Sequence, residues 1–338
     1  MLEKPDFPDE KIVTCLQAGY GLTVVSLTFL PLGADHNAAV YRAISEDACA
    51  YFVKLRRGAF DELAVPSPKF LSHQGIRHII PPLATKQGAL WANLAPYTLI
   101  LYPFVEAHNG YQTELSAHHW REFGQALKRI HTAAVPAALT GRIPGETFSP
   151  YWRDRLRYFL VRVATETFAD PVAAQLARLF QAEEAMIGDL LARTERLAET
   201  LQRQPRDFVV CHSDVHAGNV LIDQHGAFYI VDWDNPILAP KERDLMFPGG
   251  GQGFRGHSLQ EEEMLFYEGY GQTSVDAVAL AYYRYQRIIE DLAVYCEQLL
   301  ESDEGGEDRA QSLYYVRSNF LPNGTLAIAY QSDRSLSP

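Results

Sequence analysis

Residues able to carry out chemistry gather in one segment of the chain, just past its middle. His212 and Asp214 follow an apolar run, Asn219 comes five residues after Asp214, and Asp232 closes a later apolar run. Phosphoryl transfer needs a carboxylate to orient the attacking hydroxyl, and an amide with a second carboxylate to hold Mg²⁺ on the phosphates. The pattern His-x-Asp-x-x-x-x-Asn, followed by Asp-Trp-Asp, therefore predicts transfer of a phosphoryl group.

Simpler explanations exist for the separate parts of this segment. Asp and Asn often start turns and close strands without any catalytic role. His212 and His216 could instead ligate zinc with Asp214, but the segment is predicted to be a loop, unlike the helix that presents an HExxH pair. We expect His212 to brace the loop through hydrogen bonds.

A lysine within an apolar strand is the next chemical candidate. Lys54 lies in the run Tyr51-Phe52-Val53-Lys54-Leu55, where an ammonium group is costly to bury unless an anion meets it. The phosphates of ATP are such an anion. The alternative is a lysine on an edge strand that points to water.

The helix after this strand should provide the carboxylate that pairs with the lysine. Glu62 is the first candidate and Asp61 the second. Pro66 and Pro68 follow closely, and a proline inside a helix breaks it, so we expect this helix to end there or to restart with Ser67 as its cap.

Two glycine-containing loops are candidates for phosphate contacts. The first, from Leu32 to Asn37, joins two predicted strands at the place where a kinase covers the phosphates with backbone N–H groups, so Gly33 and Asp35 are expected to contact the nucleotide. The second, Gly249-Gly250-Gly251, lacks the GK[ST] ending and the preceding strand of a phosphate loop. We interpret it as a flexible connector.

Charged residues at helical spacing are candidates for binding the acceptor. Arg284, Arg287 and Asp291 fall at i, i+3 and i+7 on one predicted helix face, and Glu290 is placed to join Arg287. Carboxylates here, or at Asp234, would suit the amines of a cationic substrate. The alternative is a salt-bridged helix surface or structural support for the catalytic loop.

Hydrophobic periodicity predicts a sheet followed by helices as the scaffold for these residues. Five short runs rich in β-branched and aromatic residues predict one antiparallel sheet. From Thr113 onward, apolar residues recur at steps of three and four and predict mainly helices, one of them long or bent between Asp170 and Arg206. The five runs are Thr23–Leu30, Ala38–Ile44, Tyr51–Leu55, Ala89–Leu94 and Tyr97–Tyr102.

A short β-island is predicted to interrupt the helices and to position the catalytic segment. Its strands are Phe208–Cys211, Val220–Ile222 and Phe228–Val231, with the last two forming a hairpin. The polar residues of the His-x-Asp and Asp-x-Asp motifs follow these strands directly.

The composition is that of a globular protein with a sizeable core, since 47% of the 338 residues are hydrophobic and 21% are charged. With 30 Lys and Arg against 42 Asp and Glu, the formal charge is −12. This balance disfavours nucleic acid and anionic membranes as partners and suits a cationic small molecule. The alternative is that the charge serves only solubility.

Nothing in the sequence predicts export, a membrane span or a zinc site. The N-terminus lacks the basic and apolar regions of a signal peptide, so a cytoplasmic location is expected. The uncharged stretch from Gln87 to Val105 contains Pro96 and Pro103 and predicts a strand pair instead of a membrane helix. The four cysteines are far apart and are expected to be reduced.

These motifs resemble those of the aminoglycoside phosphotransferase family, a branch of the protein-kinase-like fold. The resemblance is most specific from His212 to Asn219, at Asp232-Trp233-Asp234 and from Leu238 to Phe247. It implies a two-lobed α+β fold. Residues 1–102 would form a small antiparallel nucleotide-binding lobe, residues 103–108 a hinge, and residues 109–338 a mainly helical lobe for catalysis and substrate binding.

The resemblance also implies roles for the matching residues. Asp214 would be the catalytic base, Asn219 and Asp232 the magnesium ligands, and Lys54 the contact to the phosphates of ATP. The hinge residues Tyr102-Pro103-Phe104-Val105 would bind adenine through their backbone.

The implied activity is transfer of the γ-phosphoryl group of ATP to a hydroxyl of a cationic aminocyclitol antibiotic, with spectinomycin as the first expectation. Two alternatives remain open: a kinase for a metabolite such as an amino alcohol or sugar, and a catalytically silent nucleotide-binding protein. A monomer is favoured.

Overall fold

The computed structural model describes residues 3–32, 37–58, 64–302 and 305–334. Gly33, Asp35 and Glu62, three of the predicted nucleotide contacts, lie outside the described residues. The chain forms two compact units: Met1–Pro144 with His212–Pro236, and Gly145–Cys211 with Ile237–Pro338. The units therefore do not part at residue 102, and the predicted division into two lobes and a hinge stays a prediction.

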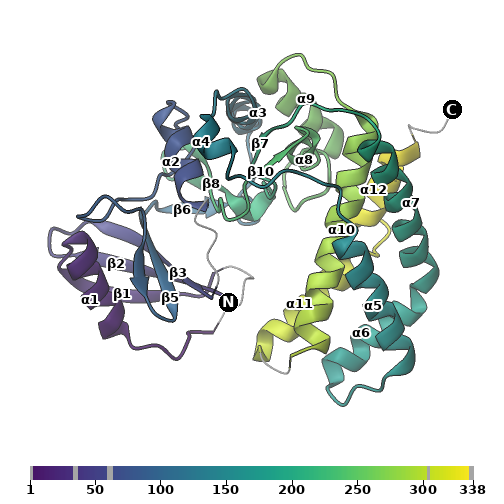
Figure 1. The fold of residues 1–338 in the computed structure, drawn as a ribbon, viewed down its shortest axis with the longest axis horizontal. Coiled ribbons are helices and arrows are strands. Elements are labelled where there is room, and N and C mark those ends of the chain that lie inside the picture. The colour runs from purple at the N-terminus through teal and green to yellow at the C-terminus, as the bar shows by residue number, and fades with distance from the viewer. Residues whose placement is uncertain (1–2, 33–36, 59–63, 303–304, 335–338) are drawn as a thin grey trace. The chain divides into compact units, whose positions relative to one another are not determined.

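The first unit contains an antiparallel sheet of five strands, in the order β1-β2-β3-β5-β4 (Figure 1). This confirms the predicted sheet. Its strands are β1 (Val24–Leu30), β2 (Ala38–Ser45), β3 (Ala50–Arg57), β4 (Ala92–Leu94) and β5 (Tyr97–Pro103).

Alternation along β3 decides where Lys54 points. Val53 and Leu55 are fully buried, and they pack with Ile12 and Leu16 of helix α1 (Asp9–Tyr20) on one side of the sheet. Successive side chains of a strand point to opposite faces, so Lys54 lies on the other side. Helix α1 was not predicted, although its two buried residues have helical spacing.

Helix α2 (Pro66–His73) begins at its first proline. Proline is well suited to the first helical position because that N–H has no partner within the helix. Val65 occupies the N-cap position, so the prediction that Ser67 would cap a restarted helix is wrong.

Two small sheets take the place of the single predicted β-island. In the first unit, β6 (Ala107–Asn109), β8 (Val220–Asp223) and β9 (Phe228–Ile230) form a three-stranded sheet, which confirms the predicted hairpin. In the second unit, β7 (Val209–Cys211) pairs with β10 (Ile237–Ala239). Both β6 and β10 are three residues long, too short for a periodicity to identify.

Helix α3 (Ala117–His131) covers the β6-β8-β9 sheet in the first unit. Its apolar residues Trp120, Phe123, Leu127 and Ile130 are buried, as their spacing predicted. Phe123 lies 5.5 Å from Phe228 of β9, measured between ring centroids. The hairpin that precedes Asp232 is therefore fixed to a helix.

Helix α10 (Ala277–Leu300) is the central element of the second unit (Figure 1). It is buried on most sides, as expected of a helix that other helices surround. The predicted long or bent helix after Asp170 is two helices, α6 and α7, which part at Glu183. The remaining helices are α4 (Ala137–Thr140) in the first unit and α5 (Tyr151–Thr165), α6 (Pro171–Ala182), α7 (Glu184–Gln202), α8 (Glu242–Leu245), α9 (Leu259–Tyr270), α11 (Gly306–Ser318) and α12 (Thr325–Arg334) in the second.

Across the described ranges, no helix combines the length and the apolar character needed to cross a membrane.

The glycine-rich segment at 249–251 is packed into the second unit, so its interpretation as a flexible connector is wrong. Gly249 and Gly250 are buried, and Gly249 has a φ of 65°, which glycine adopts without strain. The Gly249 N–H donates to the carboxylate of the buried Glu262 at 3.1 Å. Burial, partly offset by this hydrogen bond, raises the pKa of Glu262 to about 7.

Glu262→Gln is expected to stabilise the protein above neutral pH and to have little effect near pH 4. The pKa of about 7 in the folded protein exceeds the ordinary value of 4.5, so stability falls as the pH rises between these two values. Ionised Glu262 then costs the folded state about 3 kcal/mol at pH 8, which the neutral amide avoids. Calorimetry at pH 8 should give a Tm about 4 °C above that of wild type. An equal gain at pH 4 would contradict this explanation.

Candidate active site

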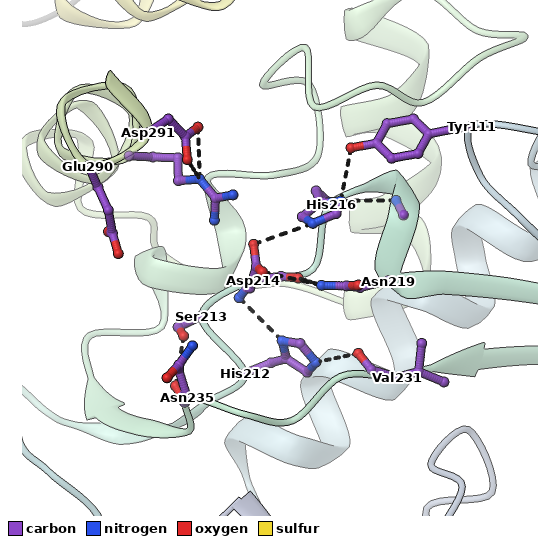
Figure 2. Close-up of polar contacts among 12 residues, drawn as sticks. Tyr111, His212, Ser213, Asp214, His216, Asn219, Val231, Asn235, Glu290 and Asp291 are labelled. Carbon is purple, nitrogen blue, oxygen red and sulfur yellow. Dashed lines mark hydrogen bonds and ion pairs between the residues drawn. The ribbon is translucent and has the colours of Figure 1, made fainter. Parts of the chain in front are cut away.

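Hydrogen bonds hold the loop His212–Asn219 in one conformation (Figure 2). His212 donates from Nε2 to the carbonyl of Val231 at 2.9 Å and accepts the N–H of Asp214 on Nδ1 at 3.2 Å. A backbone carbonyl can only accept and a backbone N–H can only donate, so these two bonds define the tautomer of the ring. The prediction that His212 braces the loop is confirmed.

Asn219 connects Asp214 to the strand that leads to Asp232. Its Nδ2 donates to the backbone carbonyl of Asp214 at 2.8 Å and to Oδ2 of the same residue at 3.3 Å. The Asn219 carbonyl accepts the N–H of Val231 at 3.0 Å. With its amide nitrogen used in this way, Asn219 keeps Oδ1 as an acceptor.

Two residues of this region have left-handed backbone conformations. Ser213 has a φ of 72° and Asp232 a φ of 68°. Such conformations cost side-chain-bearing residues about 1 kcal/mol or more, and they persist where surrounding contacts enforce them. The Ser213 hydroxyl donates to the carbonyl of Asn235 at 2.8 Å, which links the catalytic loop to the segment after Asp234.

Lys54 joins the sheet to the Asp-x-Asp motif within the first unit. Its ammonium lies 2.6 Å from Oδ1 of Asp232 and 2.8 Å from both carboxylate oxygens of Asp234. Arg56, on the same side of β3, donates to Oδ2 of Asp234 at 2.9 Å. The partners of Lys54 in the described chain are thus Asp232 and Asp234, whereas the predicted partner, Glu62, lies outside it.

The charged groups of this cluster shift one another's pKa values. Desolvation opposes ionisation of Asp232, but the Lys54 ammonium outweighs it and holds the pKa of Asp232 below its usual value. Desolvation and the charge of Asp232 together raise the pKa of Asp234. Desolvation also opposes the charge on Lys54, but the two carboxylates more than compensate, so its pKa lies above the usual range. Asp214 acts electrostatically on Asp232 as well, which places the catalytic candidates in one cluster.

Asp234, predicted to bind the acceptor, pairs with two cations of β3. Lys54 and Arg56 both bond to its carboxylate. This carboxylate therefore supports Lys54, and acceptor binding by Asp234 stays a prediction. The alternation of side chains along β3 would have predicted that Arg56 joins them.

The predicted hinge has few backbone N–H groups that could donate to adenine. Pro103 has no N–H, and the N–H of Phe104 donates to the carbonyl of Ala50 at 3.1 Å. Of the three predicted contacts, Val105 is therefore the one that has an N–H to offer. The Arg42 guanidinium lies 4.7 Å from the centre of the Phe104 ring, and this cation–π contact fastens the segment to β2. Adenine binding by this segment stays a prediction.

The predicted acceptor residues lie on α10 in the second unit. Arg287 pairs with Asp291 at 3.0 Å, one helical turn away. Glu290 was expected to join Arg287, but its described partner is Arg243 of α8 at 3.7 Å. Arg284 is buried and bonds to the carbonyls of Met246 and Pro248, among others, so it does not line an open polar face.

One residue that contacts the loop His212–Asn219 was not predicted from the sequence. The hydroxyl of Tyr111 lies 3.0 Å from Nδ1 of His216, a separation of 105 positions along the chain (Figure 2). His216 was visible in the motif, but only as a possible zinc ligand. No local pattern identifies a tyrosine in a turn as its partner.

The sheet, the lysine on β3, the braced His-x-Asp loop and the Asp-x-Asp motif together define a phosphotransferase with a kinase-like fold. A model of the phosphotransferase enzyme family matches residues 28–245, and the chain belongs to this family. The predicted fold class, family and kind of enzyme are confirmed.

Comparison with solved structures gives the same result over nearly the whole chain. The chain is 36% identical to spectinomycin phosphotransferase solved with ADP and spectinomycin, with a TM-score of 0.89, covering 98% of this chain and 100% of that one. The AMP-bound form of that enzyme is also 36% identical, with a TM-score of 0.84, covering 95% and 98%. Protein StrN of Streptomyces griseus is 23% identical over 226 residues, which are 64% of this chain and 67% of StrN.

Proposed function

We propose that this protein is an ATP-dependent kinase that phosphorylates a hydroxyl of an aminocyclitol antibiotic, with spectinomycin as its acceptor. The observation that carries the proposal is the convergence of Lys54, Asp214, Asn219 and Asp232 in one compact unit. The similarity to a structure that contains ADP and spectinomycin supports this choice of nucleotide and acceptor. We further propose that the enzyme works as a monomer in the cytoplasm.

The chemistry of Asn219 and Asp232 fits a magnesium ion. Mg²⁺ prefers hard oxygen ligands, and these residues offer an amide oxygen and a carboxylate. The Nδ2 of Asn219 is engaged with Asp214, which leaves Oδ1 for the metal. The lowered pKa of Asp232 keeps it ionised at neutral pH. Bound there, Mg²⁺ would neutralise charge on the phosphates.

The residues of the chain then divide the reaction between them. Asp214 orients the acceptor hydroxyl and receives its proton as the oxygen forms a bond to the γ-phosphorus. The bond from that phosphorus to the bridging oxygen breaks, and ADP leaves. Lys54 offsets the negative charge of the phosphates. Holding the acceptor hydroxyl in line with the γ-phosphorus supplies most of the remaining rate enhancement.

The acceptor is proposed to be cationic, and phosphorylation would then add negative charge to it. The formal charge of −12 suits attraction of a cation. Glu290 and Asp291 remain the proposed contacts for its amines, and Arg287 the proposed support for Asp291.

Acceptor profiling tests the proposal. Purified protein with labelled ATP and Mg²⁺ should phosphorylate spectinomycin, and mass spectrometry with NMR would locate the phosphate. Choline, homoserine and methylthioribose are the matched non-antibiotic acceptors. Product from one of these and none from spectinomycin would favour a metabolite kinase, and no product from any acceptor would favour a silent nucleotide-binding protein. Chelation of divalent cations should abolish turnover, and added Mg²⁺ should restore it.

A further inference from the structure

The ring of His216 lies beside the carboxylate of Asp214, the proposed base, near Oδ1, whereas Asn219 approaches Oδ2. His216 Nδ1 is 3.0 Å from the N–H of Gly218 and 3.0 Å from the hydroxyl of Tyr111 (Figure 2). The rings of His216 and Tyr111 are stacked, with centroids 5.8 Å apart and planes inclined by 26°. Three groups therefore hold the imidazole in one orientation.

The bond from Gly218 identifies the tautomer of His216. A backbone N–H can only donate, so Nδ1 accepts and carries no proton. A neutral imidazole then holds its proton on Nε2, the nitrogen that lies 3.7 Å from Oδ1 of Asp214. This distance exceeds that of a hydrogen bond, but contacts of catalytic groups often shorten when substrate binds.

Two glycines make this arrangement possible. A Cβ at Gly218 would lie 2.7 Å from Cε1 of His216 and 2.8 Å from Cε2 of Tyr111. A Cβ at Gly110 would lie 2.9 Å from the carbonyl oxygen of Ala217, to which the Gly110 N–H donates at 2.8 Å. The turn that carries Tyr111 is thus bonded to the catalytic loop through its backbone.

We infer that His216 is a positioning residue that orients the carboxylate of Asp214, and that Tyr111 holds His216 for this task. The inference rests on the proposed function because it takes Asp214 as the base. Asn219 donates to one carboxylate oxygen and His216 Nε2 lies 3.7 Å from the other, so on closer approach the two groups would together define the plane of the carboxylate. That plane determines which lone pair faces the acceptor hydroxyl.

Substitutions of His216 test this inference through kcat and KM. His216→Leu should lower kcat by about 10- to 100-fold and leave the KM for ATP within twofold, because the nucleotide contacts do not involve His216. His216→Gln should recover most of kcat, since its amide keeps an N–H donor and an acceptor. Tyr111→Phe keeps the ring and loses the hydroxyl, and it should lower kcat about threefold. His119→Gln is the control, because His119 caps α3 and bonds to Gly226 instead of Asp214.

A double variant shows whether His216 acts through Asp214. In an Asp214→Asn background, adding His216→Leu should cost less than about twofold in residual turnover. A wild-type kcat in His216→Leu would overturn the inference. So would a loss of residual turnover in the Asp214→Asn background as large as the loss that His216→Leu causes in the wild-type enzyme. A fall in Tm and nucleotide affinity together with kcat, unrelieved in His216→Gln, would assign His216 a purely structural role. Full turnover in Asp214→Ala would instead overturn the proposed mechanism itself.

Discussion

Asp214→Ala should lower turnover by about 10² to 10⁴, the contribution typical of a positioned base. The loop should keep its conformation, because Asn219 Nδ2 also bonds to the backbone carbonyl of Asp214 at 2.8 Å, and His212 still accepts the backbone N–H of residue 214. Steady-state assays of spectinomycin phosphorylation measure the loss, and circular dichroism with thermal unfolding checks the fold.

The matched control is Asp207→Asn, which neutralises an exposed carboxylate shortly before the catalytic loop. It should leave kcat within about twofold of wild type, since surface substitutions rarely change more than a few tenths of a kcal/mol. Unchanged turnover in Asp214→Ala would remove this residue from its proposed role. An equal loss in both variants would show a general effect of charge.

Lys54→Met should lower both turnover and stability. Loss of the ammonium removes the proposed phosphate contact, and we expect kcat/KM for ATP to fall by about 10² or more. It also leaves Asp232 and Asp234 without the cation that lies 2.6 and 2.8 Å from them. The free energy of unfolding should fall by about 2 kcal/mol, less than for a fully buried pair because Asp232 keeps 44% of its side chain exposed.

The loss of stability in Lys54→Met should depend on pH. Lys54 holds the pKa of Asp232 below its ordinary value, so the stabilisation is present above that ordinary value and is lost as the pH falls through the folded-state pKa. Denaturation curves of the variant and wild type should therefore differ at pH 7 and converge toward pH 3. Lys54→Arg, which keeps the charge but not the shape, should restore stability more than turnover. A difference that stays constant over this range would contradict the pairing.

The parts of the fold that follow from local patterns were predictable. Runs rich in β-branched and aromatic residues predicted the sheet and placed Lys54 in it, and apolar residues at steps of three and four predicted α3. The His-x-Asp-x-x-x-x-Asn motif identified Asp214 and Asn219 because the residues that must cooperate lie within one loop. Such patterns depend only on near neighbours in the chain, so they can be recognised in the sequence alone.

Packing decided which charged groups pair. Lys54 meets Asp232 across 178 positions and Tyr111 meets His216 across 105 positions, and no local periodicity links residues so far apart. For the same reason the sequence alone did not pair Asp234 with Arg56, and it paired Glu290 with Arg287 instead of Arg243. It also treated Gly249 as flexible, because an exposed turn and a buried one have similar composition. The chain by itself determined which residues are available for chemistry. The tertiary structure determined their partners, because burial and charge pairing depend on surfaces that exist only after distant segments meet.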